Sequence, residues 1–140
     1  MPQYHLDTNL GHDTFKALDA FTQGYIECAF WLGSEDDGIP DTGFHDLAPE
    51  ALKKMKEDCK AFQELAGADL EKAYDYAPSS YDASNAGHDF WLTRNGHGAG
   101  FWDRGFGGLR TDTIGGRLSR DAKTFGCCDL YLGDDGKVYI

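Results

Sequence analysis

Residues 88–108 read HDFWLTRNGHGAGFWDRGFGG, and this stretch decides the fold that the sequence predicts. It holds two of the three tryptophans and two of the five histidines. Residues 89–94 and 100–104 are rich in aromatic residues and flank a glycine-rich turn, a pattern typical of two strands joined as a hairpin. Because side chains alternate between the faces of a strand, Phe90 and Trp91 lie on opposite faces. We therefore expect a hairpin with aromatic residues on both faces.

Two longer segments before this stretch have helical periodicity. Residues 13–32 carry apolar side chains at steps of three and four, and residues 49–66 combine a narrow apolar stripe with charges elsewhere. In the first segment Ile26, Phe30 and Trp31 widen the apolar surface beyond one stripe. The first helix is therefore buried on more than one side or carries a contact face.

The rest of the chain adds a short helix at 69–76, a helix at 112–125 and a closing hairpin. The strands of that hairpin are 128–133 and 137–140, around the turn sequence DDG. The expected fold is α+β, with a four-stranded, mainly antiparallel sheet whose two hairpins flank a helix and pack against two N-terminal helices. The expectation is one domain over residues 1–140, with a helical part at about 8–76 and a ββαββ part at about 88–140.

The charge of the chain is strongly negative and unevenly distributed. The net charge is −11; residues 1–90 carry 18 acidic residues and six lysines, a net charge of −12, and residues 91–140 carry a net charge of +1. Direct nucleic-acid binding is therefore disfavoured, whereas a basic protein surface is a suitable partner. The sequence lacks an apolar run of the roughly 18–20 residues that a membrane span needs, and the N-terminal residues do not resemble a secretory signal. We expect no membrane association.

The cysteines and histidines do not form a recognisable metal motif. Four cysteines are present without any C-x-x-C spacing, which argues against structural zinc and favours a reducing cytoplasm. In a regular hairpin, His88 and His97 would lie about 20 Å apart. The spacing leaves open a metal-binding cluster of His88 and Asp89 with His45 and Asp46. We expect neither a metal nor a cofactor.

The glycine-rich turn also gives a weak anion-binding signal. Residues 95–100, NGHGAG, miss the G-x-G-x-x-G spacing, and the segment that follows is not the helix that phosphate loops require. Backbone amides near Arg94 or Arg104 can still attract an anion. Without a recognisable nucleophile and base, enzymatic activity stays uncertain, and the sequence favours a protein that is not an enzyme.

Three segments resemble a family of small proteins from tailed bacteriophages and prophages. They are AGHDFWLTRNGHGAGFWDRG at 86–105, LDAFTQGYIECAFWLGSEDDG at 18–38 and FGCCDLYLGDDGKVYI at 125–140. The resemblance supplies no reaction or cofactor. It implies a phage-encoded accessory protein, located in the cytoplasm of the infected bacterial host, that binds, or binds and inhibits, a host or anti-phage defence protein.

The predicted binding residues come from the hairpin and from an acidic patch. They are Trp91, Arg94, His97, Trp102, Asp103, Arg104, Glu35, Asp36 and Asp37. The alternative function is a small-ligand binding protein or hydrolase that holds a nucleotide or another anion at residues 94–104. A third interpretation is a homo-oligomer whose aromatic face is a subunit interface.

Overall fold

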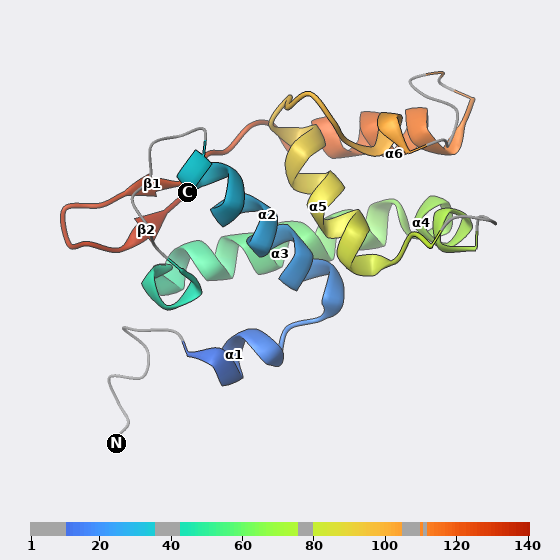
Figure 1. Ribbon diagram of the computed structural model, residues 1–140. Coiled ribbons are helices and arrows are strands. Elements are labelled where there is room, and N and C mark those ends of the chain that lie inside the picture. Colours follow the sequence, from blue (N-terminus) through green and yellow to red (C-terminus); the bar gives the residue numbers. More distant parts are fainter. Residues whose placement is uncertain (1–10, 36–42, 76–79, 105–109, 111) are drawn as a thin grey trace.

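The computed structural model describes residues 11–35, 43–75, 80–104, 110 and 112–140, and these residues are mostly helical (Figure 1). The helices are α1 (His12–Lys16), α2 (Ala20–Glu35), α3 (Pro49–Leu65), α4 (Gly67–Tyr74), α5 (Ala83–Arg94) and α6 (Ile114–Lys123), with 3-10 turns η2 (Phe44–Asp46) and η3 (Phe101–Asp103). Strands β1 (Tyr131–Leu132) and β2 (Val138–Tyr139) complete the described elements. None of the described helices is long and apolar enough to cross a membrane.

The prediction of a four-stranded sheet is wrong. Among the described residues the strands are β1 and β2, which pair antiparallel with Tyr131 opposite Tyr139. Residues 89–94 lie in helix α5, and the second predicted strand at 100–104 contains η3. The closing hairpin is confirmed, although its strands are shorter than expected, and Gly136 in the DDG turn has a φ of +81°.

Helix α5 differs from the prediction because it lies inside the core. It contacts α2, α6 and η3, and residues 89–94 are buried without interruption. Because these six residues are all buried, they show no alternation of buried and exposed positions, and periodicity cannot distinguish such a short run from a strand. Its start is nevertheless encoded locally, because the Asp82 carboxylate accepts a hydrogen bond of 2.9 Å from the backbone N–H of Asn85.

Two glycines allow α2 and α5 to cross at close range. A Cβ atom on Gly87 would overlap the carbonyl oxygen of Phe21, and one on Gly24 would overlap the carbonyl oxygen of Ser84. The two backbones therefore touch where each helix lacks a side chain. This crossing is the most extensive pairing of elements in the fold.

The predicted helix at 13–32 is two helices, α1 and α2. The chain breaks at Asp19, whose carboxylate accepts a hydrogen bond of 2.8 Å from the backbone N–H of Thr22 and so caps α2. Helix α2 then continues past Gly33 to Glu35. The helix predicted at 49–66 is confirmed as α3, with Pro49 in its first turn.

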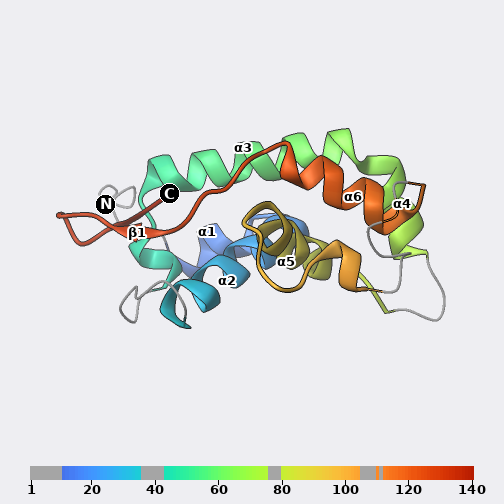
Figure 2. The ribbon, with the colours of Figure 1, turned by 90° about the horizontal axis from the view of Figure 1, so that it is seen from above.

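The helices form two layers, as Figure 2 shows from above. Helices α3, α4 and α6 lie on one side, and α1, α2 and α5 lie on the other. Aromatic rings join the layers: Phe62 of α3 stacks on Phe90 of α5 with ring centroids 4.3 Å apart, and Phe125 meets Phe90 edge-on at 5.2 Å. The C-terminal hairpin is attached to the start of α3, because the backbone N–H of Ala48 donates to the carbonyl of Val138 at 2.9 Å.

Candidate functional site

Arg94, predicted to contact a partner, is instead the centre of a buried polar network. Its side chain is 2% exposed, and its Nη1 atom donates to Asp58 of α3 at 2.8 Å and to the Tyr25 hydroxyl of α2 at 2.9 Å. Nε and Nη2 donate to the carbonyls of Gly126 and Phe125, at 2.8 and 2.9 Å, just beyond the end of α6. The guanidinium therefore joins four elements of the core.

Trp91 is also a core residue. It is completely buried, and its ring meets Tyr25 edge-on at 5.3 Å. His97 is half-buried in the loop after α5, where its backbone N–H donates to the Leu92 carbonyl at 3.0 Å. The indole nitrogen of Trp91 and Nε2 of His97 are buried, and neither forms a hydrogen bond within the described part of the chain. In the structure Trp91 packs in the core and Arg94 links core elements through hydrogen bonds.

The remaining predicted binding residues are more accessible or lie beyond what the structure describes. Trp102 is half-buried in η3, and Asp103 and Arg104 are exposed at its end. Glu35 is the last residue of α2, and its side chain is not described. Asp36 and Asp37 lie outside the described residues.

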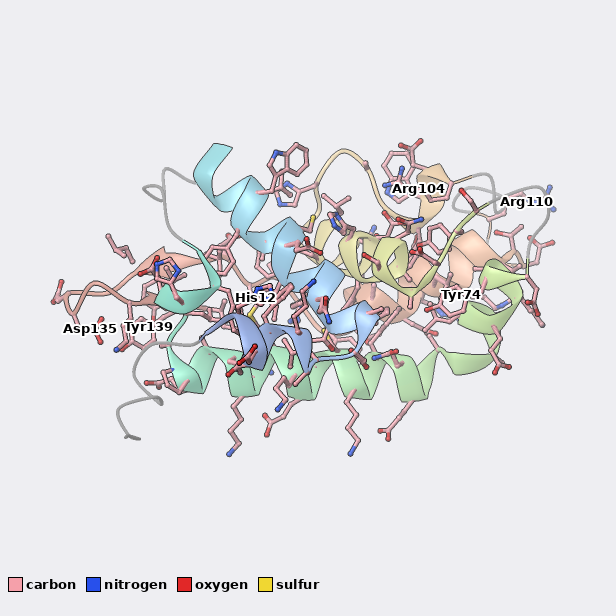
Figure 3. All side chains as sticks on the ribbon, turned by 60° about the horizontal axis from the view of Figure 1, so that its bottom comes forward. His12, Tyr74, Arg104, Arg110, Asp135 and Tyr139 are labelled. Atoms are coloured by element: carbon pink, nitrogen blue, oxygen red, sulfur yellow. The ribbon has the colours of Figure 1, made fainter. Side chains whose placement is uncertain are left out.

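Arg104 is held by a buried carboxylate that belongs to the opening stretch of sequence. Asp89 is 1% exposed and accepts hydrogen bonds from Arg104 Nε at 3.0 Å and Nη2 at 2.7 Å. The Tyr81 hydroxyl donates to the same carboxylate at 2.6 Å. Burial, together with the charge and hydrogen bond of Asp89, raises the pKa of Tyr81 well above its usual value, so Tyr81 remains a hydrogen-bond donor. Figure 3 shows Arg104 alongside α5.

A hollow that we call the aromatic pocket opens between α1, α2, α5 and η2. It has a volume of about 630 Å³. Its rings come from distant parts of the chain, since Phe15 of α1 meets Phe44 of η2 edge-on at 5.1 Å, and Trp31 of α2 is 59% exposed at its margin. The lining residues are Gly11, His12, Phe15, Ile26, Glu27, Phe30, Trp31, Gly43, Phe44, His45 and His88.

A second, smaller hollow, the polar pocket, lies beside the Asp89 network. It has a volume of about 300 Å³ and is lined by Tyr81, Asn85, His88 and Arg104. All four side chains can form hydrogen bonds. His88 lines both pockets, so the two hollows adjoin across this residue.

A third hollow of about 880 Å³ lies between α1 and α3. Its rim combines three lysines with three acidic residues: Lys53, Lys56 and Lys60 with Asp19, Glu57 and Glu64. These charges balance, so they select neither an anionic nor a cationic partner. The two pockets that meet at His88 are therefore the better candidate site.

The structure brings together part of the histidine cluster that the sequence left open. His45 and His88 line the same pocket, whereas Asp89 points into the core and Asp46 caps η2 by accepting from the Gly43 N–H at 2.9 Å. Within the described residues, no three His, Cys, Asp or Glu side chains are grouped to hold a metal ion.

One part of this arrangement has a signal in the sequence. The wide apolar surface of Ile26, Phe30 and Trp31 predicted a helix buried on more than one side or carrying a contact face, and all three residues line the aromatic pocket. The contributions of Phe15 and Phe44 could not be predicted, because they depend on how α1 folds back towards η2. Comparison with protein-family models, curated proteins and solved structures found no match to this chain.

Proposed function

We propose that this chain is a binding protein that recognises a basic surface of another protein through the aromatic pocket. Trp31 carries the proposal: its indole is 59% exposed at the margin of a pocket that also holds Phe30 and Glu27. The faces of aromatic rings attract the cationic groups of lysine and arginine, and a carboxylate strengthens that attraction. The net charge of −11 favours the approach of a basic partner.

The biological setting comes from the resemblance to phage proteins. It supports a partner that is a host or anti-phage defence protein, met in the cytoplasm of an infected bacterium and inhibited when its basic surface is covered. Glu35, Asp36 and Asp37 follow Trp31 in the sequence and remain predicted contacts with such a surface.

The small-ligand alternative now involves fewer of the predicted binding residues. Arg94 and Arg104 do not share a site, since one pairs with Asp58 and the other with Asp89. An anion can therefore meet Arg104 but not the buried Arg94. Homo-oligomerisation also stays a prediction, and light scattering over a range of protein concentrations tests it.

The first experiment compares capture of partners from bacterial lysate by the wild type and by Trp31→Ala, Glu27→Gln and Leu65→Ala. Leu65 is the matched control, because it is 57% exposed but does not line the aromatic pocket. We expect a basic protein that the wild type and Leu65→Ala retain, that Trp31→Ala and Glu27→Gln lose, and that high salt releases. Equal retention by all four proteins contradicts the proposal.

The second experiment tests the pocket directly with N-acetyl-arginine amide as the probe. Titration is followed by the indole N–H signals in the NMR spectrum, with the buried Trp91 as an internal reference. We expect a saturable shift of the Trp31 signal that weakens in Glu27→Gln, while the Trp91 signal stays in place. No shift of Trp31 at saturating probe would count against a cation-binding pocket.

A further inference from the structure

Asp58 and Asp89, the buried carboxylates among the described residues, hold their arginines in different ways. Arg94 donates from Nε, Nη1 and Nη2 to acceptors of the protein, and its side chain is 2% exposed. Within the described residues Arg104 donates from Nε and Nη2, both to Asp89, and its side chain is 36% exposed. The outer edge of the Arg104 guanidinium, formed by Nη1 and the second N–H of Nη2, makes no hydrogen bond within the described part of the chain.

This outer edge is held in a fixed position. The carboxylate of Asp89, a residue that is 1% exposed, accepts hydrogen bonds from Nε and Nη2, the inner edge of the Arg104 guanidinium. The Tyr81 hydroxyl holds this carboxylate in place with a hydrogen bond of 2.6 Å. An arginine fixed in this way loses little conformational freedom when it binds a ligand. Two parallel N–H groups fit the two oxygens of a carboxylate.

Arg104 lines the polar pocket together with other residues that can form hydrogen bonds. Asn85 and His88 line the hollow together with Arg104 and Tyr81. The volume of about 300 Å³ admits one small group and not a large ligand. The negative charge of Asp103 also acts on Arg104. With Asp89 and Asp103 nearby, a monoanion is favoured over a dianion such as phosphate.

We propose that the polar pocket binds a carboxylate of the partner protein, with the outer edge of Arg104 as the main donor and Asn85 and His88 beside it. The inference rests on the proposed function and makes it more specific. Because His88 lines both pockets, the partner presents a lysine or arginine to the aromatic pocket and an aspartate, glutamate or chain terminus next to it.

The test is an NMR titration of the whole chain with N-acetyl-glutamic acid amide, which offers a side-chain carboxylate, and with N-acetyl-alanine, which offers a terminal one. Inorganic phosphate is the third probe, and sodium chloride controls for ionic strength. The readout is the Nε–H signal of Arg104 in the NMR spectrum, with that of the buried Arg94 as an internal reference. We expect one or both carboxylates to shift the Arg104 signal saturably and to leave those of Arg94 and Trp31 in place.

Two variants assign that shift to the pocket. Arg104→Lys keeps a positive charge beside Asp89 but loses the paired N–H groups, so carboxylate affinity should fall at least about fivefold, measured on the backbone N–H signals of residues 85 and 88. Asn85→Ala leaves the Asp89 network intact and should weaken binding about two- to threefold, which keeps the test valid if Arg104→Lys does not fold.

The outcomes separate this inference from the proposed function. Absence of a saturable Arg104 shift with both carboxylates, tighter binding of phosphate than of either, or unchanged affinity in Asn85→Ala overturns the carboxylate site. Failure of N-acetyl-arginine amide to shift Trp31, while carboxylates still shift Arg104, overturns the cation-binding pocket instead.

Discussion

Arg94 Nη1 lies 2.8 Å from Asp58 Oδ2 in the interior of the protein, with side chains 2% and 8% exposed. Lys54 approaches the other oxygen of Asp58 at 2.8 Å from the surface. The pair links the middle of α3 to the end of α5. A residue that the sequence suggested for binding thus determines how the layers fit together.

Replacing Arg94 should destabilise the protein strongly. Arg94→Met leaves Asp58 without its buried partner and removes the donor to the Phe125 and Gly126 carbonyls, so we expect a loss of about 3–5 kcal/mol in the free energy of unfolding. Urea denaturation measures it. Arg110→Met is the matched control, because the Arg110–Asp112 pair is exposed and should contribute less than about 1 kcal/mol. Equal losses of unfolding free energy in the two variants would disprove the stabilising role of Arg94.

The glycine crossing gives a second prediction. In Gly87→Ala the new methyl group meets the Phe21 carbonyl, a backbone atom that cannot move without shifting α2, so we expect a loss of at least about 2–3 kcal/mol. Gly67→Ala serves as the control, because a Cβ there meets no atom within 4 Å and alanine favours helix by about 1 kcal/mol. Thermal unfolding should show opposite shifts of the melting temperature, and a stable Gly87→Ala protein would argue against the tight crossing.

The exposed cysteine Cys127 should react much faster than the buried cysteines Cys28 and Cys59. Burial raises the pKa of Cys28 to about 12, with a further contribution from the charge of Asp89, and burial also raises the pKa of Cys59 far above the usual thiol value. Cys127 is exposed. Labelling with a thiol reagent at pH 8, followed by mass spectrometry, should modify Cys127 first and spare Cys28 and Cys59 until denaturant is added. Modification of Cys28 as fast as Cys127 in the folded protein would contradict this.

Asp19 should make stability depend on acidic pH. Burial alone would raise the pKa of Asp19, but hydrogen bonds from Thr22 and Gln63 outweigh it and hold the pKa below its ordinary value of 3.8. The folded state thus favours the charged form, and its contribution to stability is present above about pH 4 and disappears as the pH falls through the folded pKa. The stability gap between wild type and Asp19→Asn should close on acidification. A carboxyl titration midpoint above 3.8 would refute this.

How much the sequence predicted depends on where each element lies. Helix α3 has one face on the core and one towards solvent, so its periodicity predicted it correctly. Residues 89–94 of helix α5 have no face towards solvent, and this buried run looked like a strand. The useful signals were local: Asp82 as a cap, and Gly87 at the close approach to the Phe21 carbonyl of α2.

The candidate site was harder to predict than the fold. Arg104 was predicted as a contact and lines the polar pocket, but its orientation depends on Asp89, which no periodicity assigns to it. Trp31 was noticed only as part of a wide apolar surface. Pockets formed by side chains from four separate elements are properties of the tertiary structure, and a single sequence does not encode them locally.

The close crossing of α2 and α5 has a consequence for recognition. Glu27 and Trp31 stand on one of these helices and Asn85 and His88 on the other. The close approach of Gly24 to Ser84 and of Gly87 to Phe21 therefore fixes the spacing between the two pockets. The proposed partner would therefore meet a preorganised surface and would lose little affinity to ordering it. To fill both pockets at once, it would need a cation and a carboxylate separated by the distance between the pockets.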